Sequence, residues 1–100
     1  MGLYAYIGRD GPRGAELRKT VRERHIAHIE ALDAAGRIVY AGPRRGADEA
    51  PCGSLIVLEA DDFAAAEAIA QQDPYTAEGV FERVDVHGTQ AVFPKAGQAD

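Results

Sequence analysis

The chain has 100 residues, 46% hydrophobic and 27% charged, and its 11 Lys and Arg against 16 Asp and Glu give a net charge of −5. This composition is typical of one small globular domain and excludes a disordered chain. The acidic balance disfavours broad contact with nucleic-acid backbones. The longest strongly apolar run, Leu55–Leu58, is too short to span a membrane. Cys52 is the single cysteine, so no intrachain disulfide is expected, and the sequence predicts a cytoplasmic protein.

Hydrophobic periodicity and turn residues predict one domain over residues 1–94, followed by a flexible tail over 95–100. The expected elements, in chain order, are a strand over 3–8, a helix over 14–35, strands over 37–42 and 53–60, a helix over 63–72, a helical fragment over 75–79 and a strand over 80–87. The order β-α-β-β-α-β is that of the ferredoxin-like α+β fold. The segment 43–52 is expected to be a loop that either borders a site or only connects two strands.

Two helices cover only one face of such a sheet. We assign Tyr4, Tyr6 and Tyr40 to the other face, together with one side of the apolar run 55–58. An open apolar sheet face on a chain of this size usually belongs to an interface. The sequence therefore predicts a homodimer in which the two sheets face each other.

One histidine interrupts the apolar stripe of the first helix. On a helical wheel, Val21, Ile26, Ile29 and Leu32 lie within an arc of about 140°, and His25 lies inside it. A core-facing imidazole needs a buried hydrogen-bond partner, or it lines a cavity. A carboxylate partner would orient the ring for general acid–base chemistry. A backbone carbonyl partner would instead make the histidine structural.

Four carboxylates are candidates for this partner: Asp33, Glu59, Asp73 and Asp85. Asp73 directly precedes a proline, which biases its backbone towards the extended region. The same position also fits an Asx turn that ends a helix, and local sequence does not separate the two interpretations.

Other patterns narrow the function further. His25 and His28 have the i, i+3 spacing of some metal sites, but no cysteine cluster or HExxH motif accompanies them, so no metal is expected. The chain has no phosphate-binding glycine loop, and the strand over 53–60 lacks the stacking aromatics of RNA-binding domains. The five cations between Arg13 and Arg24 form either a solvated helix face or the rim of a pocket for a small anion.

Short fragments along the chain together resemble the YCII-related family of small bacterial proteins, from Leu3 to about Phe93. These fragments are Val21-Arg22-Glu23-x-His25, Gly36-Arg37, Ala41-Gly42-Pro43, Gly53-Ser54, Asp73-Pro74-Tyr75 and Ala77-x-Gly79-Val80-Phe81. The chain departs from the family pattern in a shorter loop around residues 48–52. It also ends in Phe93-Pro94 where the family has a more basic terminus.

The resemblance implies a dimeric α/β-barrel of ferredoxin-like protomers, similar in plan to muconolactone isomerase. It also implies a His–Asp pair, which falls here on His25 and Asp73. One branch of the family removes chloride from a chlorinated hydroxyquinol, and that reaction reaches this chain by analogy only.

Taken together, the residues and the resemblance predict cofactor-free acid–base chemistry of the lyase, isomerase or dehydrochlorinase type. The ligand would be a small cyclic or carbonyl-bearing anion, with His25 as base or acid and Asp73 as its orienting partner. The candidate substrate-binding residues are Arg22 (with Arg24 as an alternative cation), Ser54, Gly42 and Tyr75. The alternative is a non-catalytic ligand-binding or accessory homodimer in which His25 is structural.

Overall fold

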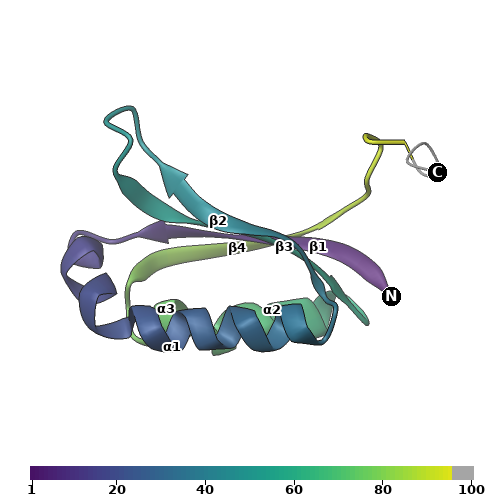
Figure 1. The fold of residues 1–100 in the computed structure, drawn as a ribbon, viewed down its shortest axis with the longest axis horizontal. Helices are drawn as coiled ribbons and strands as arrows, with labels where there is room; N and C mark the ends of the chain where they lie inside the picture. The colour runs from purple at the N-terminus through teal and green to yellow at the C-terminus, as the bar shows by residue number, and fades with distance from the viewer. Residues whose placement is uncertain (96–100) are drawn as a thin grey trace.

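A computed structural model describes residues 1–95 as a four-stranded antiparallel sheet with its helices on one face (Figure 1). The elements are β1 (Gly2–Asp10), α1 (Gly14–Ala34), β2 (Ile38–Arg45), β3 (Pro51–Ala60), α2 (Phe63–Gln72), α3 (Pro74–Ala77) and β4 (Phe81–Thr89). The strand order is β2-β3-β1-β4. This arrangement confirms the predicted α+β ferredoxin-like fold, the protomer plan of dimeric α/β-barrel proteins. The tail expected over 95–100 lies, apart from Lys95, outside the described residues.

Local sequence explains where the helices begin and end. Gly14, the first residue of α1, lies so close to β1 that a Cβ there would be 2.7 Å from the Cβ of Asp10. Gly36 follows the helix with φ +75°, in the left-handed region that favours glycine. The side chain of Asp62 caps α2 by accepting a hydrogen bond from the N–H of Ala65 at 2.8 Å.

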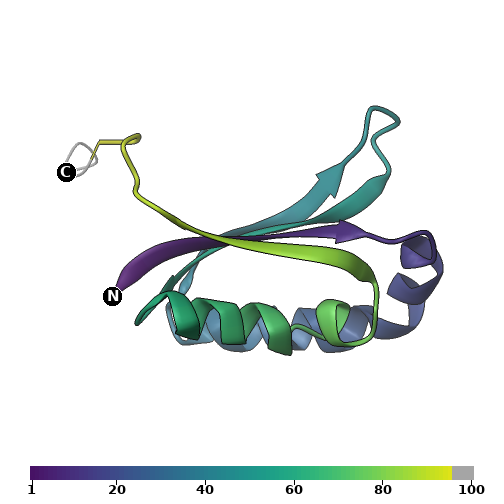
Figure 2. The same cartoon turned by 180° about the vertical axis from the view of Figure 1, so that it is seen from behind.

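The core lies between the sheet and the helices, the two layers that Figure 2 shows from behind. One cluster packs α2 against the middle of the sheet: Tyr6, Ile56, Leu58, Ala60, Ala66 and Ala70. A second cluster packs α1 and α3 against the start of β4: Val21, Tyr75, Val80 and Phe81. The alanines of α2 carry small side chains, so this helix packs close to β3 and β1.

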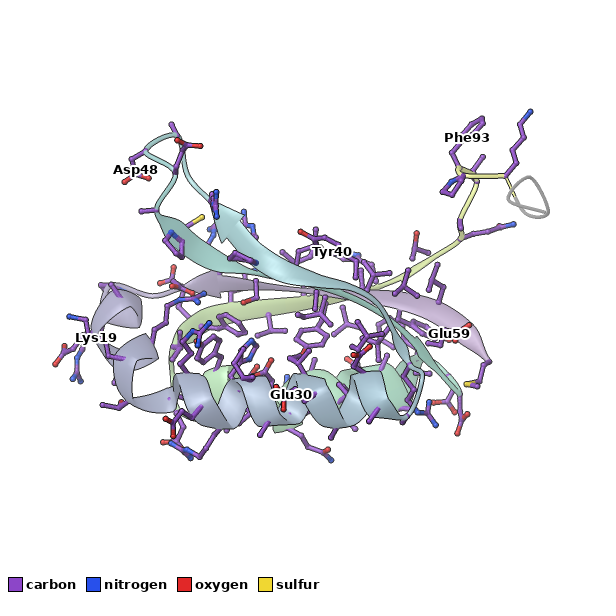
Figure 3. The ribbon with its side chains drawn as sticks, viewed as in Figure 1. Lys19, Glu30, Tyr40, Asp48, Glu59 and Phe93 are labelled. Carbon is purple, nitrogen blue, oxygen red and sulfur yellow. The ribbon has the colours of Figure 1, made fainter. Side chains whose placement is uncertain are left out.

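The prediction that Tyr4 and Tyr6 face away from the helices is wrong. Tyr6 is 1% exposed in the core, and Tyr4 packs against the same cluster. The alternation on β1 is apolar on both faces, so it could not indicate which face the helices cover. Tyr40 does lie on the open face, where Figure 3 shows it on the side of the sheet away from the helices.

A bulge in β2 breaks the simple alternation of the sequence, which would make Ile38 and Tyr40 point the same way. The pairing with β3 shifts between these two residues, so Val39 is an extra residue in the strand. Ile38 packs into the core, whereas Tyr40 pairs with Val57 on the open face. Positions after the bulge therefore alternate in the opposite phase from the one that the sequence suggested.

The ten-residue loop expected over 43–52 is also wrong. The strands continue to Arg45 and resume at Pro51, and these two residues pair, which leaves only residues 46–50 as the turn. Pro43 did not end the strand because β2 is an edge strand, where a missing N–H is tolerated. The resulting hairpin rises from the sheet on the side away from the helices, and so does the segment after β4 at the opposite end (Figure 1).

Candidate functional site

His25 and Asp73 are in hydrogen-bond contact. The Nδ1 atom of His25, on α1, lies 2.7 Å from Oδ1 of Asp73, at the junction of α2 and α3. Asp73 is fully buried, and His25 is 7% exposed. Of the four carboxylates that the sequence left open, this is the one that reaches the imidazole, while Asp85 accepts from Arg83 on β4.

Three elements hold the Asp73 carboxylate. Its Oδ1 also accepts the backbone N–H of Tyr75 at 2.9 Å, and its Oδ2 accepts the hydroxyl of Tyr6, on β1, at 2.8 Å. Pro74 follows, and Asp73 has φ −60° and ψ 124°, so it ends α2 and caps α3. Asp73 is therefore both the partner of the imidazole and the residue of the Asx turn, because its Oδ1 makes both contacts.

This network decides the charge of its members. Burial raises the pKa of Asp73, but hydrogen bonds from His25, Tyr75 and Tyr6 outweigh it and leave the pKa below the usual value. Burial, reinforced by the adjacent carboxylate, raises the pKa of Tyr6, so its hydroxyl stays protonated and donates. Because an ionised Asp73 only accepts, Nδ1 of His25 carries the hydrogen of this bond.

Aromatic contacts fix the plane of the imidazole. The rings of His25 and Tyr75 stack with centroids 3.9 Å apart and 4° between their planes, and Phe81 packs edge-on to Tyr75 at 5.6 Å. The guanidinium carbon of Arg18 lies 4.7 Å from the centre of the Tyr75 ring. The imidazole is thus positioned by packing as well as by its carboxylate.

A cavity of about 340 Å³ opens at His25, within the size range of small-molecule sites. Its lining comes from α1, β2, β3 and α3: Arg18, Arg22, His25, Ile26, Ile29, Ala41, Gly42, Pro43, Pro51, Ser54, Ile56 and Tyr75. Arg18 is held by Asp10 at 2.6 and 3.0 Å and donates to the carbonyl of Gly53 at 3.0 Å. Arg22, which is exposed, also lines this cavity, so two arginines border it.

The structure brings most of the predicted site residues to this cavity. Arg22, Ser54, Gly42 and Tyr75 line it together with the imidazole, and their roles in binding stay predictions. Asp73 lies behind the ring, outside the lining. A Cβ at Gly42 would lie 2.6 Å from the hydroxyl of Tyr40, which is the far end of a half-exposed side chain and can move aside.

Arg24, the alternative anion-steering cation, points elsewhere. Its guanidinium pairs with Glu78 at 3.3 Å, and both side chains are largely exposed. Sequence reasoning did not predict two residues of this site. Tyr6 was assigned to the wrong face of the sheet, and Arg18 was not distinguished from the other four cations between Arg13 and Arg24. The i, i+4 and i+7 spacing of Arg18, Arg22 and His25 could have indicated a shared helix side.

His28 does not join the site. Its Nε2 is buried without a hydrogen-bond partner in the part of the chain that the structure describes. Burial lowers the pKa of His28, and the carboxylate of Asp73 and the nearby backbone of Ile69 only partly oppose that shift. Within residues 1–95, no three His, Cys, Asp or Glu side chains lie close enough together to hold a metal ion. No helix in the same range is both long and apolar enough to cross a membrane.

The fold and this cavity define a small ferredoxin-like protein with a buried His–Asp pair behind a ligand-sized pocket. Residues 2–89 match the YCII-related domain, so the chain belongs to the YCII-related family. Protein YciI of Escherichia coli is 35% identical over 97 residues, covering 91% of this chain and 99% of that protein. An uncharacterized protein of Haemophilus influenzae is 35% identical over 96 residues, covering 90% and 98%.

Among solved structures, the chain is similar to 5-chloro-2-hydroxyhydroquinone dehydrochlorinase from Burkholderia phenoliruptrix, in complex with 2,5-dihydroxybenzoquinone. The TM-score is 0.78 at 27% identity, over 88% of this chain and 93% of that one. A Mycobacterium tuberculosis protein has a TM-score of 0.52 at 14% identity, over 90% and 93% of the two chains, and supports the fold alone.

Proposed function

We propose that the protein binds a small cyclic or carbonyl-bearing anion in the cavity at His25 and that this histidine transfers a proton there. The observation that carries the proposal is the placement of the imidazole. Nδ1 is held by the buried carboxylate of Asp73, while the ring lines a cavity of about 340 Å³. That arrangement leaves Nε2 to meet a ligand, with its tautomer and orientation already set.

The cationic border supports an anionic ligand. Arg18 is immobilised by Asp10, and its ion pair, against the effect of burial, raises its pKa. Arg22 sits exposed at the same cavity. The hydroxyl of Ser54 is nearby, and the apolar wall of Ile26 and Ile56 suits a ring. A quinol or keto acid matches both features.

The reaction class follows from what these groups can do and from the relative of known activity. His25 can take or return a proton, which suits an isomerase, a lyase or a dehydrochlorinase. Loss of HCl from a chlorinated hydroxyquinol moves one hydroxyl proton to the chlorine-bearing ring carbon, and the C–Cl bond then breaks as a second hydroxyl proton is removed. Chloride and one proton are released and the ring is left as a quinone, so the step needs no external oxidant. The related dehydrochlorinase supports this last class for our chain.

We also propose that the protein is a homodimer in the cytoplasm. The face away from the helices carries partly exposed apolar side chains of β1 and β3: Leu3, Ala5, Ile7, Leu55 and Val57. Packing this face against a second copy would bury it in the way that two-sheet proteins do. The single cysteine is in keeping with a reducing compartment.

The experiment is a matched pair of variants, His25→Gln and His28→Gln, which remove a histidine from the same helix. Chloride release from 5-chloro-2-hydroxyhydroquinone would be measured alongside binding of 2,5-dihydroxybenzoquinone. We expect His25→Gln to lose at least about a hundredfold in kcat while the fold is kept, because the acid–base group is gone. His28→Gln should stay within about twofold, since this side chain does not line the cavity. Equal turnover in wild type and His25→Gln would disprove the mechanism.

A second function is favoured by one observation, the capping role of Asp73. Its Oδ1 holds the N–H of Tyr75 and thereby starts α3, which is a structural task. In this alternative the protein is a ligand-binding or accessory homodimer, and His25 only completes the network. It predicts that His25→Gln lowers stability or ligand affinity, with no turnover in the wild type.

A further inference from the structure

We propose that the segment after β4, residues 90–95, of a second copy lies in the groove between α1 and β2 and closes the open side of the His25 cavity. We call this segment the C-terminal arm. The proposal rests on the homodimer proposed above, and it makes each site depend on both chains.

The C-terminal arm exposes apolar side chains to solvent. Val92 is 65% exposed and Phe93 is 74% exposed. Figure 3 shows Phe93 beyond the end of the sheet, on the side away from the helices. An arm that carries large apolar groups away from its own core needs another surface to cover them.

A matching surface lies at the other edge of the sheet. A groove of about 400 Å³ runs between α1 and β2, and Val39 and Tyr40 line it with exposures of 60% and 51%. Six large hydrophobic residues of the range 1–95 are exposed: Met1, Val39, Tyr40, Phe63, Val92 and Phe93. Three of the six, Val39, Val92 and Phe93, thus belong to the groove or the arm, so docking one in the other would cover them, while the ring of Tyr40 lies beside them on the open face.

The groove and the C-terminal arm also carry opposite charges. Glu30 and Asp33 also line the groove, and among the described residues neither forms an ion pair. Lys95 follows Phe93 by two residues on the arm, so an arm seated on its apolar side chains would bring a cation to this acidic rim.

The topology favours docking on a second copy over docking on the same chain. β2 and β4 are opposite edges of the sheet, and the arm leaves β4 towards the open face, whereas the groove lies beside α1. A twofold axis that runs along the strands between two facing sheets places β4 of one copy beside β2 of the other. Packed sheets lie about 10 Å apart. The four residues from Thr89 to Phe93 can span about 13 Å.

The groove is continuous with the candidate site. Ile26, Ile29 and Ala41 line both the groove and the cavity at His25. An arm in the groove therefore shields the apolar end of the cavity from water, while the cationic end stays with its own chain. Shielding of this kind strengthens the electrostatic contacts that a ligand makes inside.

Chemical cross-linking between two different chains tests the proposal. In a Cys52→Ser background, one chain carries Val39→Cys and the other Phe93→Cys; the two are refolded together and treated with a short bismaleimide. We expect a covalent heterodimer with the summed mass of both variants. The matched control replaces Phe93→Cys with Phe63→Cys, an exposed aromatic position on α2, and should give no heterodimer. A chain with both cysteines that links only within itself would overturn the proposal, and so would no heterodimer.

A second measurement asks whether the arm contributes to the site. Phe93→Ala should weaken binding of 2,5-dihydroxybenzoquinone by about tenfold, and Phe63→Ala by less than twofold. Unchanged affinity in Phe93→Ala would overturn the claim that the arm closes the cavity. If the wild type does not bind the quinone, that result counts against the proposed function. The docking of the C-terminal arm is then tested by the cross-linked heterodimer alone, because cross-linking needs no ligand.

Discussion

Two histidines three residues apart on α1 have different surroundings. His25 contacts the carboxylate of Asp73, stacks on Tyr75 and lines a cavity. His28 has a buried Nε2 without a hydrogen-bond partner in the described range, and its side chain does not line the cavity at His25. Both histidines thus have buried ring atoms, and burial alone does not mark the imidazole at the candidate site. The difference comes from the carboxylate of Asp73, which the junction of α2 and α3 places against His25.

The largest expected effect on stability comes from removing the carboxylate of Asp73, which His25 contacts. Asp73→Ala leaves three buried donors without their acceptor, on His25, Tyr6 and Tyr75. We expect the free energy of unfolding to fall by about 3–5 kcal/mol, measured by urea denaturation. Asp85→Ala is the control, because it removes a carboxylate from a partly exposed pair with Arg83 and should cost less than about 1 kcal/mol. A loss below about 1 kcal/mol in Asp73→Ala would show that the network contributes little.

Acid should weaken the His25 region through the same carboxylate. The pKa of Asp73 in the folded chain lies below the ordinary value of 3.8, because its hydrogen bonds outweigh burial. Its contribution is therefore fully present above about pH 4 and is lost as the pH falls through the folded pKa. Urea unfolding from pH 6 to pH 3 should show this loss. Asp73→Asn should flatten the curve, and an equally steep curve in that variant would assign the pH dependence to other groups.

The smallest effect is expected at His28, and its sign is opposite. His28→Leu removes a buried nitrogen that has no hydrogen-bond partner among residues 1–95 and should stabilise the protein by about 1 kcal/mol at pH 7. Burial lowers the pKa of His28, so in the wild type its unfolded form gains a proton first as the pH falls below about 6.5. The advantage of the leucine variant should therefore grow between pH 7 and pH 5 in thermal melts. A variant less stable than the wild type would indicate a partner for this nitrogen.

The order of strands and helices could be predicted because turn residues and alternation are local signals. The anomaly at His25 was also visible, since helical periodicity places that residue among apolar neighbours. Its partner was one of four candidates, because 48 residues separate it from Asp73 and only packing joins them. The hydrogen bond from Tyr6 to Asp73 could not be predicted, because β1 is apolar on both faces and alternation alone did not indicate which face the helices cover.

The bulge at Val39 has a consequence for comparing relatives of this chain. Because one extra residue shifts the phase of β2, odd and even positions change sides within a single strand. Substitutions at Ala41 then alter the pocket wall, whereas those at Tyr40 alter the surface opposite the helices. In a relative without the bulge, the same alignment columns would describe opposite sides of the sheet. The residues that line the pocket can therefore be compared by alignment only among sequences that share this extra residue.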